Sequence, residues 1–230
     1  MLLHKTTWLT LGVFFIAITT AAGVAEPQAS NKDLKAAKLN EKKWATIDGF
    51  RSAKFGMDEK QVMRAIAKDF KLPKSKVEEE LDVIQKTKAF IITTPNIIPV
   101  GGPSNVRYIL GYKSKRLIEV SIVWPIKGAK VIDPRGVVSA SKLLLRYFLK
   151  KKYKKDHYYI NRRLKDETVN RESAIVFNGL DEKARMIRLV LTLSKNEEKK
   201  DPKEAAKDLS LQLSYMLDPF APDIFKTKAK

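Results

Sequence analysis

The spacing of apolar residues predicts two helices, each followed by a group of strands. After Asp58, apolar side chains recur at helical spacing until Leu72, and Asp58 with Gln61 has the pattern of a capping box. Pro73 then ends the predicted helix, because proline cannot donate the next backbone hydrogen bond. A short acidic helical turn is expected to follow over residues 77–81.

Later segments alternate apolar and polar residues, which is typical of strands with one buried face. The first group of predicted strands covers residues 89–94, 106–112 and 118–124, and the second covers 158–162, 174–177, 187–193 and 209–217. Between the groups, Asp133 and Pro134 mark the start of a second helix. The inward stripe expected for that helix consists of Val137, Val138, Ser141, Leu144, Leu145 and Phe148.

This order of elements predicts an α+β fold, with an antiparallel sheet and helices packed on one of its faces. It also suggests two helix-plus-three-strand repeats, the first over residues 44–130 and the second over 131–220. Residues 26–43 are expected to form a flexible leader or a weak helix, and residues 221–230 a basic tail.

The N-terminus has the pattern of a secretory signal peptide over residues 1–25. An apolar run from Trp8 to Ile18 is followed by small residues, with Gly23 and Ala25 at the −3 and −1 positions of a cleavage site. The expected location is therefore the periplasm. The alternative is an uncleaved inner-membrane anchor formed by residues 6–25, because a bilayer needs roughly 20 apolar residues.

Composition excludes several kinds of chemistry. The 230 residues include 45 Lys and Arg against 26 Asp and Glu, a net charge of +19, two His and no Cys. Without a thiol, the chain cannot form disulfides, thiolate metal sites or cysteine nucleophiles. Removal of the signal peptide would leave His157 as the single imidazole, and we expect it on the surface. No cofactor and no metal ion is expected.

A basic segment carries the clearest chemical signal. Residues 142–165 hold ten Lys or Arg and one acid, Asp156. The residues predicted to bind a polyanion or a partner are Lys150, Lys151, Lys152, Lys154, Lys155, Arg162 and Arg163. For an exported protein, anionic lipid, lipopolysaccharide phosphates or an acidic protein surface are the expected partners, with peripheral membrane contact and no nucleic acid. A generic basic surface is the alternative.

A second candidate surface is the loop over residues 95–103. Its aliphatic side chains, Ile97, Ile98 and Val100, lie between prolines and glycines. They either form an exposed apolar contact loop or fold back on the core as a plug.

The sequence offers no convincing catalytic residues. Ser139 and Lys142 match the S-x-x-K motif of penicillin-recognising enzymes, but both fall on the face of the predicted helix that points to water. The acidic run of residues 78–80 is expected to be a solvated face rather than a pair of general acid and base groups.

The segment Phe55-Gly56-Met57-Asp58-Glu59-Lys60-Gln61-Val62, with the turn at Leu72-Pro73 and the meander that follows, resembles the BamE (SmpA/OmlA) family of periplasmic domains. The β-lactamase-inhibitor-protein-like fold, which repeats a related unit twice, and exported proteins of alphaproteobacteria are also similar. The resemblance covers about residues 50–125 and implies an α+β envelope protein. It carries over no binding residues, because this chain lacks the lipidated cysteine of BamE and has an additional half.

Three functional hypotheses follow from these patterns. A non-enzymatic periplasmic binding or adaptor protein predicts a continuous positive surface without a deep pocket. An inhibitor-like module predicts an exposed aromatic sheet face, with Tyr108, Tyr112 and Trp124 as its candidates. A hydrolase based on Ser139 and Lys142 predicts a cleft that contains a buried lysine.

Overall fold

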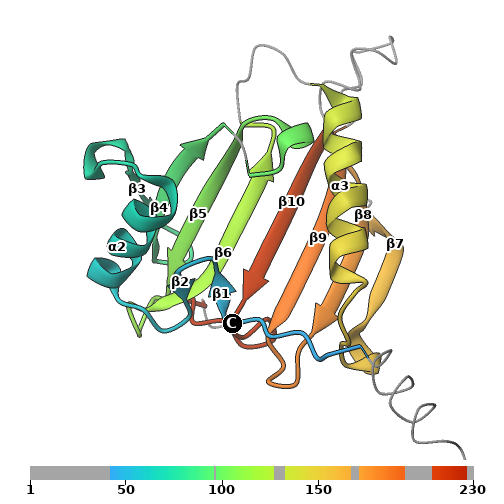
Figure 1. Ribbon diagram of the computed structural model, residues 1–230. Coiled ribbons are helices and arrows are strands. Elements are labelled where there is room, and N and C mark those ends of the chain that lie inside the picture. Colours follow the sequence, from blue (N-terminus) through green and yellow to red (C-terminus); the bar gives the residue numbers. More distant parts are fainter. Residues whose placement is uncertain (1–41, 96, 127–132, 167–170, 195–208, 227–230) are drawn as a thin grey trace, which may run out of the picture. The chain divides into compact units, whose positions relative to one another are not determined.

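Two helices cover one face of an eight-stranded antiparallel sheet (Figure 1). The computed structural model describes residues 42–95, 97–126, 133–166, 171–194 and 209–226. The predicted α+β class is confirmed. We call the sheet face opposite the helices the outer face. The predicted signal peptide and most of the predicted leader lie outside the described residues.

The first helix, α2 (Glu59–Phe70), begins as the sequence predicts. The Asp58 carboxylate accepts a hydrogen bond from the Gln61 backbone N–H at 2.8 Å, and the Gln61 side chain accepts one from the Asp58 N–H at 2.9 Å. These two bonds form the reciprocal capping box. The helix ends at Lys71, which takes a left-handed conformation with φ of 56°, two residues before Pro73.

Four strands follow α2 as an antiparallel meander: β3 (Glu78–Asp82), β4 (Thr87–Thr94), β5 (Ser104–Leu110) and β6 (Leu117–Trp124). The helical turn expected over residues 77–81 is wrong, because this acidic run is the edge strand β3. Glu79 lies 2.9 Å from Lys88 on β4, and Glu80 lies 2.8 Å from Arg107 on β5. These ion pairs to β4 and β5 offset the repulsion between adjacent carboxylates, and they cannot be read from local helical propensity.

The second half repeats this order, with α3 (Pro134–Phe148), β7 (Tyr159–Asp166), β8 (Arg171–Leu180), β9 (Met186–Ser194) and β10 (Leu209–Met216). Asp133 caps α3 by accepting a hydrogen bond from the Arg135 N–H at 3.0 Å. Within the predicted inward stripe of α3, Val137, Ser141 and Phe148 are buried, and the other three side chains are half-buried.

The two halves form one continuous sheet, with the strand order β3-β4-β5-β6-β10-β9-β8-β7. Antiparallel pairing of β6 with β10 joins them, and Leu213 lies directly opposite Ile122 at this junction. Each half therefore contributes a helix and four strands, one strand more than the sequence suggests for the first half.

Two of the three aromatic residues proposed for an exposed sheet face, Tyr108 and Trp124, lie on the face that packs against the helices. Tyr108 and Trp124 are fully buried, because strand alternation places them with Phe90 and Ile122 beneath the helices. Tyr112 is half-buried, and its ring packs edge-on against Phe225 at 5.5 Å. Tyr108 and Trp124 therefore do not form the exposed aromatic face that an inhibitor-like module predicts.

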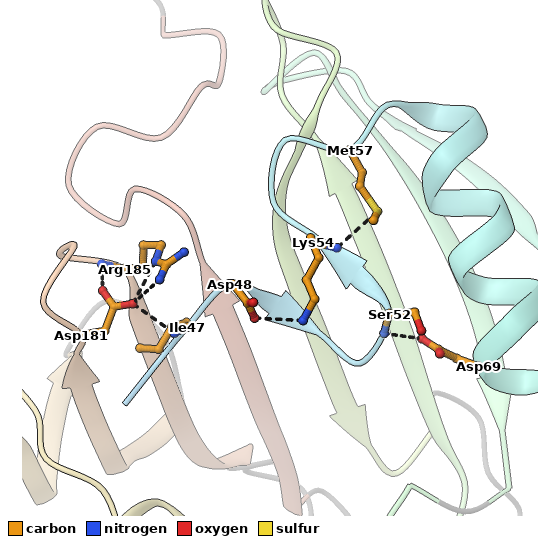
Figure 2. Close-up of polar contacts among 8 residues, drawn as sticks. All are labelled: Ile47, Asp48, Ser52, Lys54, Met57, Asp69, Asp181 and Arg185. Atoms are coloured by element: carbon orange, nitrogen blue, oxygen red, sulfur yellow. Dashed lines mark hydrogen bonds and ion pairs between the residues drawn. The ribbon is translucent and has the colours of Figure 1, made fainter. Parts of the chain in front are cut away.

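The segment before α2 is attached to the second half by the buried side chain of Asp181 (Figure 2). Its carboxylate accepts a hydrogen bond from the Ile47 backbone N–H at 3.0 Å and lies 2.7 Å from the guanidinium of Arg185. The small hairpin β1 (Gly49–Phe50) and β2 (Ala53–Lys54) follows, and the ring of Phe50 contacts that of Tyr215.

Candidate binding site

Residues 150–155, which we call the basic turn, connect α3 to the edge strand β7. Backbone hydrogen bonds hold the turn in place. The Lys152 N–H donates to the carbonyl of Lys43 at 2.9 Å, and the Lys154 N–H donates to the carbonyl of Leu180 at 3.0 Å. The turn is thus anchored both to the N-terminal segment and to β8.

Tyr153 anchors the basic turn to the core. Its side chain is buried and meets the ring of Phe177 edge-on at 5.0 Å. Gly179 makes room for it, because a Cβ at that position would lie 2.6 Å from the Tyr153 ring. Burial raises the pKa of the Tyr153 hydroxyl above its ordinary value, as expected for a buried phenol.

Within the part of the chain that the structure describes, the predicted cations have no ion-paired carboxylate. Among the described residues, no ion pair involves any of the seven predicted binding residues. Two of them contact aromatic rings: Lys152 Nζ lies 4.6 Å from the centre of Trp44, and the Arg162 guanidinium lies 4.9 Å from that of Tyr159. All seven are exposed except Lys154, which is half-buried. They therefore form an unneutralised positive surface.

A pocket of about 360 Å³ opens beside this surface, at the β7 end of the sheet. Its lining comes from β7, β8, β9, the short 3₁₀ turn before β7 and the segment after β10. The lining residues are His157, Tyr159, Arg162, Arg163, Leu164, Ile175, Asn178, Met186, Arg188 and Phe220. Arg162 and Arg163 thus belong to the pocket, whereas the five predicted lysines lie in the basic turn.

Strand register explains why the pocket combines charge with apolar surface. Asn178 pairs with Tyr159 on one side and with Arg188 on the other, so the three residues form one row across the sheet. Arg162 and Ile175 form the next row. Because directly paired residues share a face, both rows lie on the outer face, away from the helices.

Hydrogen bonds order the polar part of the pocket. Arg188 Nε donates to the Asn178 side-chain oxygen at 3.1 Å, and Asn178 Nδ2 donates to the His157 carbonyl at 2.8 Å. The apolar part consists of Ile175 and Met186, which are 8% and 2% exposed. The pocket therefore places a positioned guanidinium beside an apolar floor.

Phe220 contributes the most exposed apolar side chain at the pocket. It is 57% exposed, and its ring lies 5.1 Å from the imidazole of His157. His157 is half-buried rather than fully exposed, as part of the pocket lining.

Four pocket residues were not predicted from the sequence: Arg188, Asn178, Met186 and Phe220. Arg188 did leave a signal, because it is a single cation within the otherwise apolar alternation of β9. The other three left none, since their meeting depends on the pairing of β8 with β9 and on the path of the chain after β10.

The candidate apolar loop folds back on the core. Ile97 and Ile98 are half-buried and pack against the hydrophobic core, whereas Val100 is 45% exposed. Only Val100 therefore presents substantial apolar surface. More apolar surface is exposed at the β3–β4 hairpin, where Leu81, Val83 and Ile84 are 71%, 84% and 80% exposed.

The S-x-x-K motif lies on the solvent side of α3. Ser139 and Lys142 are both exposed, and no lysine within the described residues is buried. The described residues also contain no group of three or more His, Asp or Glu side chains that could bind a metal ion. None of the helices within the described ranges combines the length and the apolar character needed to cross a bilayer.

Together, the fold and the site define an α+β protein that carries a cationic pocket with an apolar floor at one edge of its sheet. No protein-family model, curated protein or solved structure matches the chain.

Proposed function

We propose that this protein is a non-enzymatic, exported binding or adaptor protein that attaches to an anionic component of the cell envelope. The basic turn, together with Arg162 and Arg163, is the contact surface, and anionic lipid headgroups are its partner. Lipopolysaccharide phosphates and an acidic protein surface are the rival partners.

One observation supports this proposal above the others: seven clustered cations have no ion-pair partner within the described residues. In the first half of the chain, by contrast, Lys88 and Arg107 are paired with glutamates. Each Lys or Arg that approaches an anionic membrane contributes about 1 kcal/mol. Three exposed lysines would therefore change affinity on the order of 100-fold.

The test is a vesicle-binding assay with a charge-matched control. One variant replaces Lys150, Lys151 and Lys155 with Gln, and the control replaces Lys60, Lys68 and Lys76, which are also exposed but lie on or after α2. With vesicles that contain phosphatidylglycerol, we expect the first variant to lose about 100-fold in affinity and the control to lose far less.

Equal losses in the two variants would favour a generic basic surface. Failure of the unmodified protein to bind, or elution below about 0.3 M salt, would count against a membrane partner. The same assay with vesicles that carry lipopolysaccharide, or only zwitterionic lipid, shows which source of phosphate the protein binds.

A further inference from the structure

We propose that the pocket on the outer face binds a small amphipathic anion. Its phosphate or carboxylate would lie against Arg188 and Arg162, and its apolar group against Ile175, Met186 and Phe220. The inference rests on the proposed function, because Arg162 belongs to both surfaces, and it names the chemical class of ligand that this edge of the sheet accepts.

Arg188 has hydrogen-bond donors that remain available to a ligand. A guanidinium has five N–H donors. Arg188 Nε is engaged by Asn178, and within the described part of the chain the two terminal nitrogens have no hydrogen-bond or ion-pair partner. The side chain is half-buried, and the hydrogen bond from Nε to Asn178 helps to fix its orientation. The N–H groups of its two terminal nitrogens can therefore bind a phosphate or a carboxylate.

Arg162 provides a second cation at the same pocket. Its guanidinium lies 4.9 Å from the centre of the Tyr159 ring, which restricts its position without neutralising its charge. Among the described residues, no acidic side chain lines the pocket. Glu119 on β6 interacts electrostatically with Arg188 but does not belong to the pocket lining. Two guanidinium groups at the pocket therefore favour an anion over a neutral or cationic ligand.

The apolar lining favours an anion that also carries an apolar group over a bare anion. Met186 and Ile175 are almost fully buried although no described helix covers the outer face, while Leu164 and Phe220 at the same pocket are 42% and 57% exposed. A ligand with an alkyl chain or a ring would cover this exposed surface and gain from its burial. A volume of about 360 Å³ lies at the small end of the range for ligand pockets, which indicates a single chain or ring.

The experiment measures binding of octyl phosphate below its micelle-forming concentration by titration calorimetry. Inorganic phosphate and octyl glucoside serve as reference probes, since each supplies only one of the two kinds of contact. We expect octyl phosphate to bind at least tenfold more tightly than either reference.

Two pairs of variants localise the binding. R188Q is expected to weaken octyl phosphate at least tenfold, whereas R64Q, at an exposed position on α2, leaves the affinity unchanged. F220A is expected to weaken octyl phosphate but not inorganic phosphate, and L217A, at another partly exposed residue of the same segment, serves as its control. Circular dichroism verifies that each variant folds, and R162Q provides a second cation test at an exposed site.

The outcomes separate this inference from the proposed function. Loss of vesicle binding but not of octyl phosphate binding in the triple lysine variant would support two adjoining sites. The unmodified protein could fail to bind vesicles and still bind octyl phosphate through Arg188. In that case the proposed membrane partner is wrong and the pocket inference holds. If octyl phosphate binds no better than either reference, or if R188Q and F220A bind it normally, the inference is overturned.

Discussion

At the residue scale, Asp181 carries several structural contacts at once. Its carboxylate accepts hydrogen bonds from the backbone N–H groups of Ile47, Lys183 and Arg185, and it pairs with the Arg185 guanidinium. Both side chains of the ion pair are shielded, with exposures of 2% for Asp181 and 14% for Arg185. Removing the carboxylate would leave a shielded cation and several N–H groups without partners.

We therefore expect Asp181→Ala to lower the free energy of unfolding by about 3–5 kcal/mol. Asp48→Ala is the matched control, because Asp48 also forms an ion pair in this region, with Lys54, but both partners are nearly half-exposed (Figure 2). Its cost should be about 1 kcal/mol or less. Urea denaturation measures both, and equal costs would contradict the role assigned to Asp181.

Stability is expected to depend on pH through Glu119, which lies on the outer face of β6. Burial raises its pKa above the ordinary value of 4.5, while a hydrogen bond with Ser214 and the charges of Arg188 and Arg107 partly oppose this effect. A raised pKa means that the stabilisation is complete below the unfolded-state value and is lost as the pH rises through the folded-state value.

The Glu119→Gln variant should therefore be more stable than the unmodified protein at neutral pH, and the difference should disappear below about pH 4. Urea titrations across this range provide the measurement. Glu78→Gln, at an exposed position on β3, controls for the loss of one negative charge. A Glu119 variant that is less stable at neutral pH would show that its ionic contacts outweigh its burial.

At the scale of elements, the segment after β10 is held across the ends of other strands. Asp223 accepts hydrogen bonds from the backbone N–H groups of Lys113 and Ser114 at 3.0 and 2.8 Å. The Phe225 N–H donates to Gln85 at 2.8 Å, and Lys86 Nζ lies 3.8 Å from the centre of the Phe225 ring. The segment thus connects the β3–β4 and β5–β6 hairpins.

Hydrogen bonding from Ser114, followed by that from Lys113, holds the pKa of Asp223 below its ordinary value of 3.8. Its stabilising contribution is therefore present above pH 3.8 and is lost as the pH falls through the lowered pKa. Asp223→Asn should cost about 1 kcal/mol at neutral pH, with a smaller cost in strong acid. Hydrogen exchange of residues 217–226 measures the release of the segment, and unchanged protection would contradict this expectation.

Strand β3 shows where prediction at this scale failed. Both helix starts could be read from the sequence, because Asp58 and Asp133 cap through bonds to residues two or three positions away. The edge strand β3 could not be predicted from the sequence. The residues that stabilise it, Lys88 and Arg107, approach its glutamates only when the sheet forms. A run of three glutamates has no local feature that favours a strand.

At the scale of the whole molecule, pairing of β6 with β10 makes the two halves share one core. Ile122 and Val120 from the first half and Leu211 and Leu213 from the second all belong to a single buried cluster. Neither half can open along this junction without exposing apolar surface of the other. We expect one cooperative unfolding transition for residues 42–230 rather than two.

Coincident urea curves from far-ultraviolet circular dichroism and tryptophan fluorescence would confirm this expectation. Hydrogen exchange should be slowest in β6 and β10, the central strands of the sheet. Two separated transitions would show that the halves fold as independent units.

The edges of the sheet differ in charge. β3 and β7 lie at opposite ends of the strand order (Figure 1), with glutamates on the first and Arg162 and Arg163 on the second. Charged side chains on both edge strands discourage edge-to-edge pairing between molecules. They also concentrate the positive surface at the end of the sheet where the basic turn and the pocket lie.

The sequence by itself determined the helices and most of the strands, because capping residues and apolar periodicity act over a few neighbouring positions. It also determined that cations cluster between α3 and β7, since these residues are consecutive in the chain. Only the tertiary structure decided that Tyr108 and Trp124 face the helices, that β6 joins β10, and that Arg188 and Phe220 meet Arg162 at one pocket. These arrangements depend on contacts between residues far apart in the chain, and such contacts form only when the strands pair and the helices pack on the sheet.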